Sequence, residues 1–210
     1  MNVQRLGDAV VRCIVTLPPG HLIHHGRKLM PHWNIPQPEG ETRARDIRWI
    51  VMDVDGVLTD GTIYVSDAVH ETKGFNVKDG HGMRMWQRSG KHLAIITGRS
   101  SPAVSVRSAD LDIQYVYQSA HNKRETLERF LNEAGARKEE ICYIGDDLMD
   151  IPVMREVQLA VAVADASPEA REASHLVTGA QGGRGAVREV IDLLLKLQGS
   201  WKEVTERYYS

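Results

Sequence analysis

The stretch that decides the fold is residues 51–61, which read VMDVDGVLTDG. An apolar run, IRWIVM at 47–52, leads directly into this stretch, where Asp53 and Asp55 stand one residue apart. A short apolar run that ends in polar and glycine residues is typical of a buried strand. In extended chain, side chains two positions apart share a face. The stretch therefore predicts a strand whose end carries two neighbouring carboxylates.

The same pattern recurs along the chain. Further short apolar runs lie at 92–97, 113–117, 141–146, 159–163 and 175–178. Stretches of helical character separate them, at 80–90, 101–111, 122–135, 147–157 and 185–199. Short apolar strands that alternate with helices predict a mostly parallel sheet covered on both faces. We therefore expect an α/β fold, a Rossmann-like three-layer α/β/α arrangement.

One segment interrupts this alternation. Residues 61–80 contain two short strand-like pieces, TIYV and KGFNV, with polar residues between them. Two such pieces in succession predict a β-hairpin that projects from the sheet.

The two ends of the chain differ from the middle. Residues 1–45 are dense in proline and glycine, so we expect a poorly ordered leader, with one short helix at 3–15. The histidines of HLIHH (21–25) lack cysteine or carboxylate partners at ligand spacing and are interpreted as bystanders. We expect one domain over 46–198 and a C-terminal tail over 199–210.

The composition limits the possible partners. A formal net charge of −2 gives no electrostatic reason to bind nucleic acid or an anionic membrane. No apolar run approaches the length needed to cross a bilayer. The two cysteines, Cys13 and Cys142, give no disulfide framework and fit a reducing compartment. We expect a cytoplasmic protein.

Reactive side chains collect at the ends of the predicted strands. Asp53, Thr97 and Asp146 each follow an apolar run, and Lys123 begins the helical stretch after the run at 113–117. Ligands of open parallel sheets bind beyond the carboxyl ends of the strands. We therefore expect these four side chains, which are far apart in sequence, to lie at one edge of the sheet.

The chemistry of this set indicates a cation and a phosphate. The GDDLMD motif adds Asp147 and Asp150, and several carboxylates near one point repel one another unless a cation intervenes. Oxygen ligands suit Mg²⁺, which often binds together with phosphate. The Thr97 hydroxyl and the Lys123 ammonium are suitable partners for phosphoryl oxygens. The residues thus pair a carboxylate nucleophile with groups that bind phosphate.

These residues also carry a family resemblance. DVDGVLTDG, IITGRS, Lys123 and GDDLMD are similar, in order and spacing, to the four motifs of the haloacid dehalogenase superfamily of phosphotransferases. The resemblance implies that Asp53 attacks phosphorus and that Asp55 is the acid and base. It also implies a Mg²⁺ ion held by the Asp53 carboxylate, the Asp55 carbonyl and Asp146.

The remaining roles follow from the same resemblance. Thr97, Gly98, Arg99 and Lys123 would bind the substrate, and Asp147 and Asp150 would support the metal ligands from behind. Pumps of this superfamily carry threonine two residues after the nucleophile, so Asp55 favours a phosphatase or a phosphomutase.

The chain has no room for the cap domain that covers the site in many members of the superfamily. The gaps between motifs, 61–95 and 101–122, hold only the predicted hairpin, two helices and one strand. An open site of this kind either accepts a large substrate or is closed by another subunit. We expect a homotetramer in which hairpins pack on neighbours and Arg184, in GGRG (182–185), reaches the substrate of an adjacent subunit.

Three further stretches narrow the resemblance. GFNVKDGHGM, AVADASPEA and GGRGAVREV resemble capless members that dephosphorylate an eight-carbon sugar acid phosphate in bacterial lipopolysaccharide synthesis. The resemblance covers roughly 43–196. Two alternatives remain open: a phosphatase for a nine-carbon, sialic-acid-like sugar phosphate, and a non-catalytic scaffold that keeps the acidic pocket. His81 and Arg84 face either the site or solvent.

Overall fold

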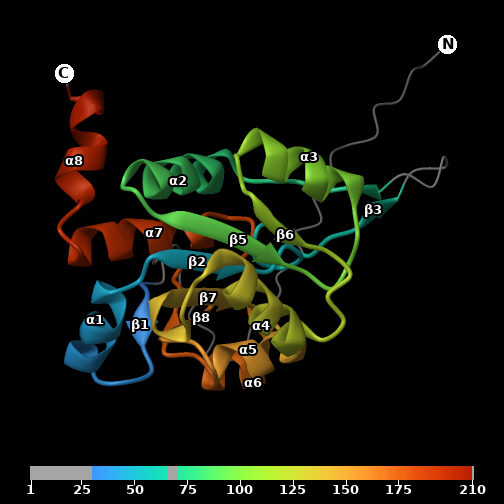
Figure 1. Ribbon diagram of the computed structural model, residues 1–210, viewed down its shortest axis with the longest axis horizontal. Coiled ribbons are helices and arrows are strands. Elements are labelled where there is room, and N and C mark those ends of the chain that lie inside the picture. Colours follow the sequence, from blue (N-terminus) through green and yellow to red (C-terminus); the bar gives the residue numbers. More distant parts are fainter. Residues whose placement is uncertain (1–29, 66–70, 210) are drawn as a thin grey trace, which may run out of the picture.

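The computed structural model describes residues 30–65 and 71–209 (Figure 1). A seven-stranded sheet runs through it in the order β1-β9-β8-β7-β2-β5-β6. These strands span His32–Trp33 (β1), Trp49–Met52 (β2), His92–Ile96 (β5), Tyr115–Tyr117 (β6), Ile141–Gly145 (β7), Leu159–Ala162 (β8) and Leu176–Val177 (β9). All neighbouring pairs are parallel except β1 with β9. The mostly parallel sheet expected from the sequence is confirmed.

Helices cover both faces of the sheet, as Figure 1 shows. Those described are Gln37–Arg45 (α1), Val77–Arg88 (α2), Pro102–Asp110 (α3), Lys123–Ala134 (α4), Ile151–Met154 (α5), Pro168–Glu172 (α6), Ala186–Leu197 (α7) and Trp201–Thr205 (α8). Helices α2, α3 and α7 lie on one face, and α4, α5 and α6 lie on the other. This arrangement is the three-layer α/β/α fold. None of the helices in the described residues is long and apolar enough to cross a membrane.

The core explains why the central strands are apolar throughout. Every residue of β2, β7 and β8 is buried, because helices cover both of their faces. Helix α7 buries a stripe at helical spacing against α2 and the sheet, comprising Val187, Val190, Ile191, Leu194 and Leu195. Each fully buried side chain of this size contributes about 1.5–3 kcal/mol of transfer free energy. The rigid centre of the sheet therefore fixes the positions of the strand ends.

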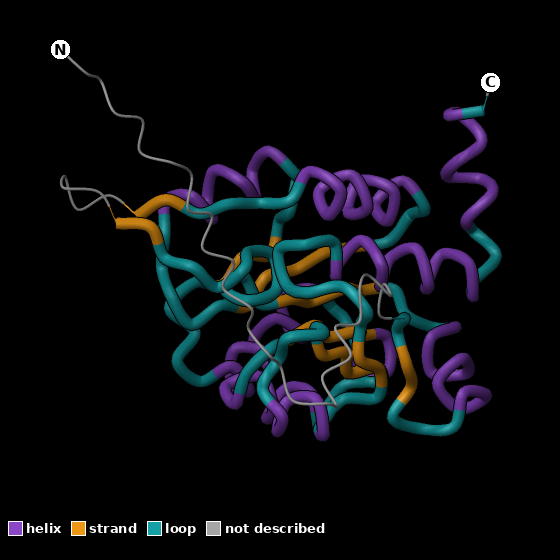
Figure 2. Tube along the Cα trace, turned by 180° about the vertical axis from the view of Figure 1, so that it is seen from behind, coloured by secondary structure: helices purple, strands orange, loops and turns teal. Residues whose placement is uncertain are grey.

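The predicted hairpin forms, but its second strand differs from the prediction. Strand β3 (Tyr64–Val65) pairs antiparallel with β4 (Glu71–Thr72), and Figure 2 shows this arm projecting from the body. The piece KGFNV at 73–77 is not a strand. Asn76 caps helix α2 instead, since its side chain accepts a hydrogen bond from the Lys78 amide, and the helix begins at Val77.

The prediction of a poorly ordered leader over 1–45 is wrong for the part that the structure describes. Residues 32–33 form β1 and residues 37–45 form α1, which packs against α7. Gly40 lets the Trp33 ring lie against the helix, because a Cβ there would stand 2.3 Å from a ring carbon. Residues 1–29, with the predicted helix at 3–15 and the histidines at 21–25, lie outside the described residues.

The C-terminal tail expected over 199–210 contains regular structure. Helix α8 follows Gly199 and packs against α2 and α7, and a short 3₁₀ turn spans Glu206–Tyr208. The described parts of the gaps between motifs hold the hairpin, α2, α3 and β6, so no cap domain is present in them.

Candidate active site

A cavity of about 250 Å³ opens at the carboxyl edge of the sheet. The ends of β2, β5 and β7 bring Asp53, Thr97 and Asp146 to it, and Lys123 enters from the first turn of α4. The residues that line it are Asp53, Asp55, Gly56, Gly61, Thr97, Gly98, Arg99, Lys123, Asp146, Asp147, Met149 and Asp150. The site residues that the family resemblance implied lie here except Arg184.

The Asp53 carboxylate is held at both oxygens. Its Oδ1 accepts a hydrogen bond from the Val54 amide at 2.6 Å, and its Oδ2 lies 2.7 Å from the Lys123 ammonium. The Asp53 amide in turn donates to the Ile144 carbonyl of β7, which joins the strand end to its neighbour. Burial raises the pKa of Asp53, and the adjacent Lys123 charge opposes this effect. The carboxylate is therefore oriented before any substrate arrives.

Asp150 organises this part of the site from a fully buried position. Its Oδ1 accepts hydrogen bonds from Lys123 and from the Tyr143 hydroxyl, each at 2.6 Å. Its Oδ2 accepts from the amides of Asp146 at 2.9 Å and Asp147 at 3.2 Å. With four donors, Asp150 fixes both Lys123 and the loop after β7.

Lys123 lies between two carboxylates, and its residue is only 3% exposed. Burial alone would lower the pKa of its ammonium, but the charges of Asp53 and Asp150 raise it above the ordinary value. The group therefore stays cationic at neutral pH and faces the cavity.

Carboxylate oxygens of Asp53, Asp146 and Asp150 all lie within 4.8 Å of one another. Burial, followed by the charges of Asp150 and Asp53, raises the pKa of Asp146 to about 8. Gly56 makes room for this carboxylate, since a Cβ there would stand 2.0 Å from Asp146 Oδ2. Crowded, oxygen-only donors of this kind fit a hard divalent cation such as Mg²⁺.

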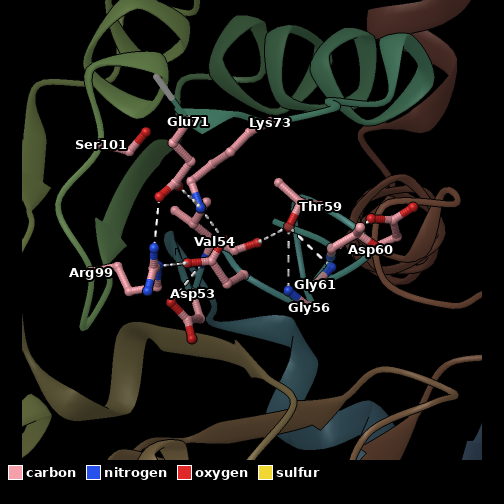
Figure 3. A network of polar contacts seen from close by, with 12 residues as sticks. Asp53, Val54, Gly56, Thr59, Asp60, Gly61, Glu71, Lys73, Arg99 and Ser101 are labelled. Atoms are coloured by element: carbon pink, nitrogen blue, oxygen red, sulfur yellow. Dashed lines mark hydrogen bonds and ion pairs between the residues drawn. The ribbon is translucent and has the colours of Figure 1, made fainter. Parts of the chain in front are cut away.

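Glu71 and Lys73 of the hairpin segment contact groups that line the cavity, and neither residue was predicted from the sequence. The Lys73 ammonium donates to Asp55 Oδ1 and lies 2.7 Å from Glu71 Oε1. Arg99 joins the same group, with Nη2 at 2.6 Å from Glu71 Oε2 and Nε at 3.6 Å from Asp55 Oδ2. Figure 3 shows these side chains converging on the end of β2. The sequence signal is the ETK triplet, because Glu71 and Lys73 share a face at strand spacing.

Thr59 shapes the loop that follows the two aspartates. Its buried hydroxyl donates to the Val54 carbonyl at 3.3 Å and accepts from the amides of Gly56 at 3.4 Å and Gly61 at 3.2 Å (Figure 3). Neighbouring Gly182 also packs on this loop, where a Cβ would stand 1.7 Å from the Gly56 carbonyl oxygen. The GGRG segment thus supports the loop with its backbone.

Three predicted candidates lie outside the cavity of their own chain. Arg184 is exposed and pairs with Asp60 Oδ2 at 3.1 Å. His81 contacts the Tyr208 hydroxyl at 2.8 Å. Arg84 pairs with Asp112. Of the two readings of His81 and Arg84, the one that places them away from the site agrees with the structure.

Comparisons with known proteins agree with this geometry. A profile of haloacid dehalogenase-like hydrolases matches residues 105–191. The 3-deoxy-D-manno-octulosonate 8-phosphate phosphatase of Salmonella typhimurium is 45% identical over 85% of this chain and 95% of its own length.

Solved structures give the same relationship. The phosphatase of that name from Moraxella catarrhalis, solved with magnesium, phosphate and the sugar acid KDO, matches with a TM-score of 0.80. It is 37% identical, over 82% of this chain and 99% of that one. A cobalt-bound phosphatase from Haemophilus influenzae matches with a TM-score of 0.74 and 34% identity, over 76% and 93% of the two chains.

Proposed function

The chain belongs to the haloacid dehalogenase-like hydrolases, and we propose that it hydrolyses 3-deoxy-D-manno-octulosonate 8-phosphate to the free sugar acid and phosphate. The observation that carries the proposal is the cavity in which Asp53, Asp55, Thr97, Lys123 and Asp146 converge. The 45% identity to a phosphatase of that name supports this choice of substrate. The reaction would serve the synthesis of a lipopolysaccharide precursor.

The first step in this proposal transfers the phosphoryl group to Asp53. A carboxylate oxygen of Asp53 forms a bond to phosphorus, and the bond from phosphorus to the sugar oxygen breaks. Asp55 donates a proton to the departing oxygen, because an alkoxide leaves poorly without one. In the second step Asp55 takes a proton from water, the water oxygen attacks phosphorus, and the Asp53 carboxylate is released.

The phosphate-binding groups are Thr97, Gly98 and Lys123 at the floor of the cavity. Thr97 is buried, and its amide donates a hydrogen bond to the Tyr117 carbonyl at 2.9 Å. This bond fixes the backbone position from which the Thr97 hydroxyl projects. Gly98 keeps the backbone accessible to a phosphoryl oxygen. Lys123 offsets the negative charge that Asp53 and the phosphate bring together.

The Asp53 carboxylate, the Asp55 carbonyl and the Asp146 carboxylate would hold Mg²⁺. Asp150 is excluded from this set, although its oxygen lies nearby, because four donors already occupy its two oxygens. Asp147 and Asp150 would not contact the ion and would instead hold the metal ligands in position. When bound, the ion neutralises the charge of the carboxylates and of the phosphoryl oxygens.

The proposal includes a homotetramer. The hairpin exposes Ile63, Tyr64 and Val65, and Val77 and Val106 are exposed on α2 and α3. Exposed apolar groups on a projecting arm are typical of a surface that another subunit covers. Arg99 lines the cavity and its side chain is 49% exposed, so we place the contact between the substrate and Arg184 of an adjacent subunit on this side.

The proposal also places the protein in the cytoplasm. Cys142, which is buried as a free thiol, supports this location, because a reducing compartment preserves such a group.

Phosphate release from a panel of sugar phosphates tests the function. The panel contains the octulosonate 8-phosphate, a nonulosonate 9-phosphate and glucose 6-phosphate, each with Mg²⁺, with Ca²⁺ and after removal of metal by EDTA. We expect the highest kcat/KM for the eight-carbon acid with Mg²⁺, and poor activity with Ca²⁺, which prefers looser and higher coordination. A higher kcat/KM for the nine-carbon acid would assign the nonulosonate 9-phosphate as the substrate instead. No turnover of any phosphate would favour a non-catalytic scaffold.

A further inference from the structure

We propose that Lys73 is a positioning residue that fixes the Asp55 carboxylate for proton transfer through Oδ2. The inference deepens the proposed phosphatase function and rests on it. Lys73 directly follows β4 of the hairpin, whereas Asp53, Thr97 and Asp146 follow strands of the main sheet.

Asp55 and three charged side chains around it form a closed ring. Lys73 donates a hydrogen bond to Asp55 Oδ1 and forms an ion pair with Glu71 Oε1, Arg99 donates to Glu71 Oε2, and Arg99 Nε faces Asp55 Oδ2 at 3.6 Å. Two cations and two anions alternate, so the ring carries no net charge. Figure 3 shows Glu71, Lys73 and Arg99 around the strand end.

The two cations of the ring differ in their exposure. The Lys73 side chain is 1% exposed, whereas that of Arg99 is 49% exposed. An ammonium buried to this extent is stable only when it is paired, so Lys73 stays with its two carboxylates. Arg99 keeps freedom to turn toward a ligand. Lys73 is therefore the permanent restraint on Asp55.

Lys73 acts through Asp55 and has no surface on the cavity. Asp55 and Arg99 line the cavity, but Lys73 and Glu71 do not. The hydrogen bond from Lys73 engages Asp55 Oδ1, and Oδ2 has only the half-exposed Arg99 near it, at 3.6 Å. We therefore assign proton transfer to Oδ2. A general acid requires hydrogen-bond reach to the departing oxygen, so a carboxylate free to rotate would lose efficiency.

A positioning role of Lys73 differs from a purely structural role in one respect: its effect on activity should depend on how readily the leaving group departs. A sugar phosphate departs as an alkoxide and needs the proton, whereas 2,4-dinitrophenyl phosphate departs as a stable phenolate. The measurement is kcat/KM, which reports the steps up to phosphoryl transfer to Asp53. The variants are Lys73→Met, Lys73→Arg and Asp55→Asn, with Lys78→Met as the matched control, because Lys78 is an exposed lysine of the same region.

We expect Lys73→Met to lose about 10²-fold on the sugar phosphate and less than about fivefold on 2,4-dinitrophenyl phosphate, in parallel with Asp55→Asn. Lys73→Arg should recover part of the loss, and Lys78→Met should match the parent protein. The apparent affinity for Mg²⁺ should remain within about twofold in every variant, which excludes collapse of the site.

Equal losses on both substrates, or no loss on either, would overturn the role of Lys73 while leaving the phosphatase intact. If Lys73→Met does not fold, Glu71→Gln provides the second variant, since it removes one of the two charges that hold Lys73. It should show the same dependence on the leaving group with a smaller amplitude, and a uniform effect on both substrates would overturn the proposal. Failure of the proposed function is a different result, because the parent protein would then release no phosphate.

Discussion

The Lys123 ammonium lies 2.7 Å from Asp53 Oδ2, at the point where the first turn of α4 meets the end of β2. The two residues are far apart in sequence, and the sheet brings them together because α4 crosses back over the face of β5 and β6. The contact orients the carboxylate, and in the proposed reaction Lys123 would also offset the charge of the incoming phosphate.

Asp53→Asn should abolish turnover and preserve the fold. The amide has almost the same shape as the carboxylate, but it is not a nucleophile toward phosphorus. The change also removes the negative charge next to Lys123. Phosphate release measures the activity, and circular dichroism with light scattering reports the fold and assembly. Phosphate release at a near-normal rate would contradict the assignment of Asp53 as the nucleophile.

Asp150→Asn should lower the free energy of unfolding by about 3–5 kcal/mol, because it leaves the buried Lys123 without one of its two carboxylates. The amide group also cannot accept from all four donors that meet Asp150. Denaturant titration measures the change. Asp147→Asn is the control, since asparagine caps a helical turn as well as aspartate does, and it should shift stability by less than about 0.5 kcal/mol. Similar effects of the two changes would contradict the organising role of Asp150.

The part of the site that lies at the carboxyl ends of parallel strands could be predicted from the sequence. Asp53, Thr97 and Asp146 follow apolar runs, and the carboxyl ends of parallel strands meet at one edge. Lys73 and Glu71 were missed because their positions depend on the pairing of the hairpin and on the start of α2 at Val77. A local pattern does not determine either feature.

The order of residues 30–45 was also beyond the sequence analysis. The proline and glycine residues in this segment are typical of a loop. In the structure, however, Gly40 leaves space for the Trp33 ring, and the Gln198 side chain donates hydrogen bonds to the carbonyls of Ala44 and Ile47. Gln198 and Ala44 are 154 positions apart in the sequence. Only the folded chain shows why the helix is stable.

The affinity for Mg²⁺ should rise with pH up to about pH 8. In the metal-free protein the pKa of Asp146 is raised to about 8, so its carboxyl is mostly protonated below that value. The cation binds the carboxylate and must displace the proton, which weakens binding by up to about tenfold for each pH unit below 8. Calorimetry at about pH 6 and pH 8, in buffers of different ionisation enthalpy, measures the affinity and the released proton. Equal affinities at the two pH values, without proton release, would contradict this prediction.

The hairpin should hold the proposed tetramer together. Val65 is 69% exposed near the tip of the arm, so Val65→Asp would place a charge in the expected interface and shift the assembly toward smaller species. Tyr209→Asp is the control, because Tyr209 is 84% exposed and adjoins the C-terminus, which lies on the opposite side of the molecule from β3 (Figure 1). Light scattering at several protein concentrations gives the masses. A parent protein that is a monomer at all concentrations would reject the assembly itself.

Arg184→Ala should raise KM for the sugar acid phosphate and barely change the hydrolysis of 4-nitrophenyl phosphate. The Arg184 side chain is 66% exposed, and within residues 30–65 and 71–209 it pairs with the partly exposed Asp60, so its guanidinium is available to a substrate in the proposed adjacent subunit. A planar guanidinium binds a carboxylate through two hydrogen bonds, and 4-nitrophenyl phosphate has no carboxylate to bind. Arg137→Ala is the matched control, because the Arg137 side chain is 73% exposed and pairs with Glu140, three residues away in sequence. Losing a charge-assisted pair should raise KM by about tenfold or more. An equal effect on both substrates, or normal kinetics of the variant on the sugar acid phosphate, would reject Arg184 as the residue that binds the carboxylate.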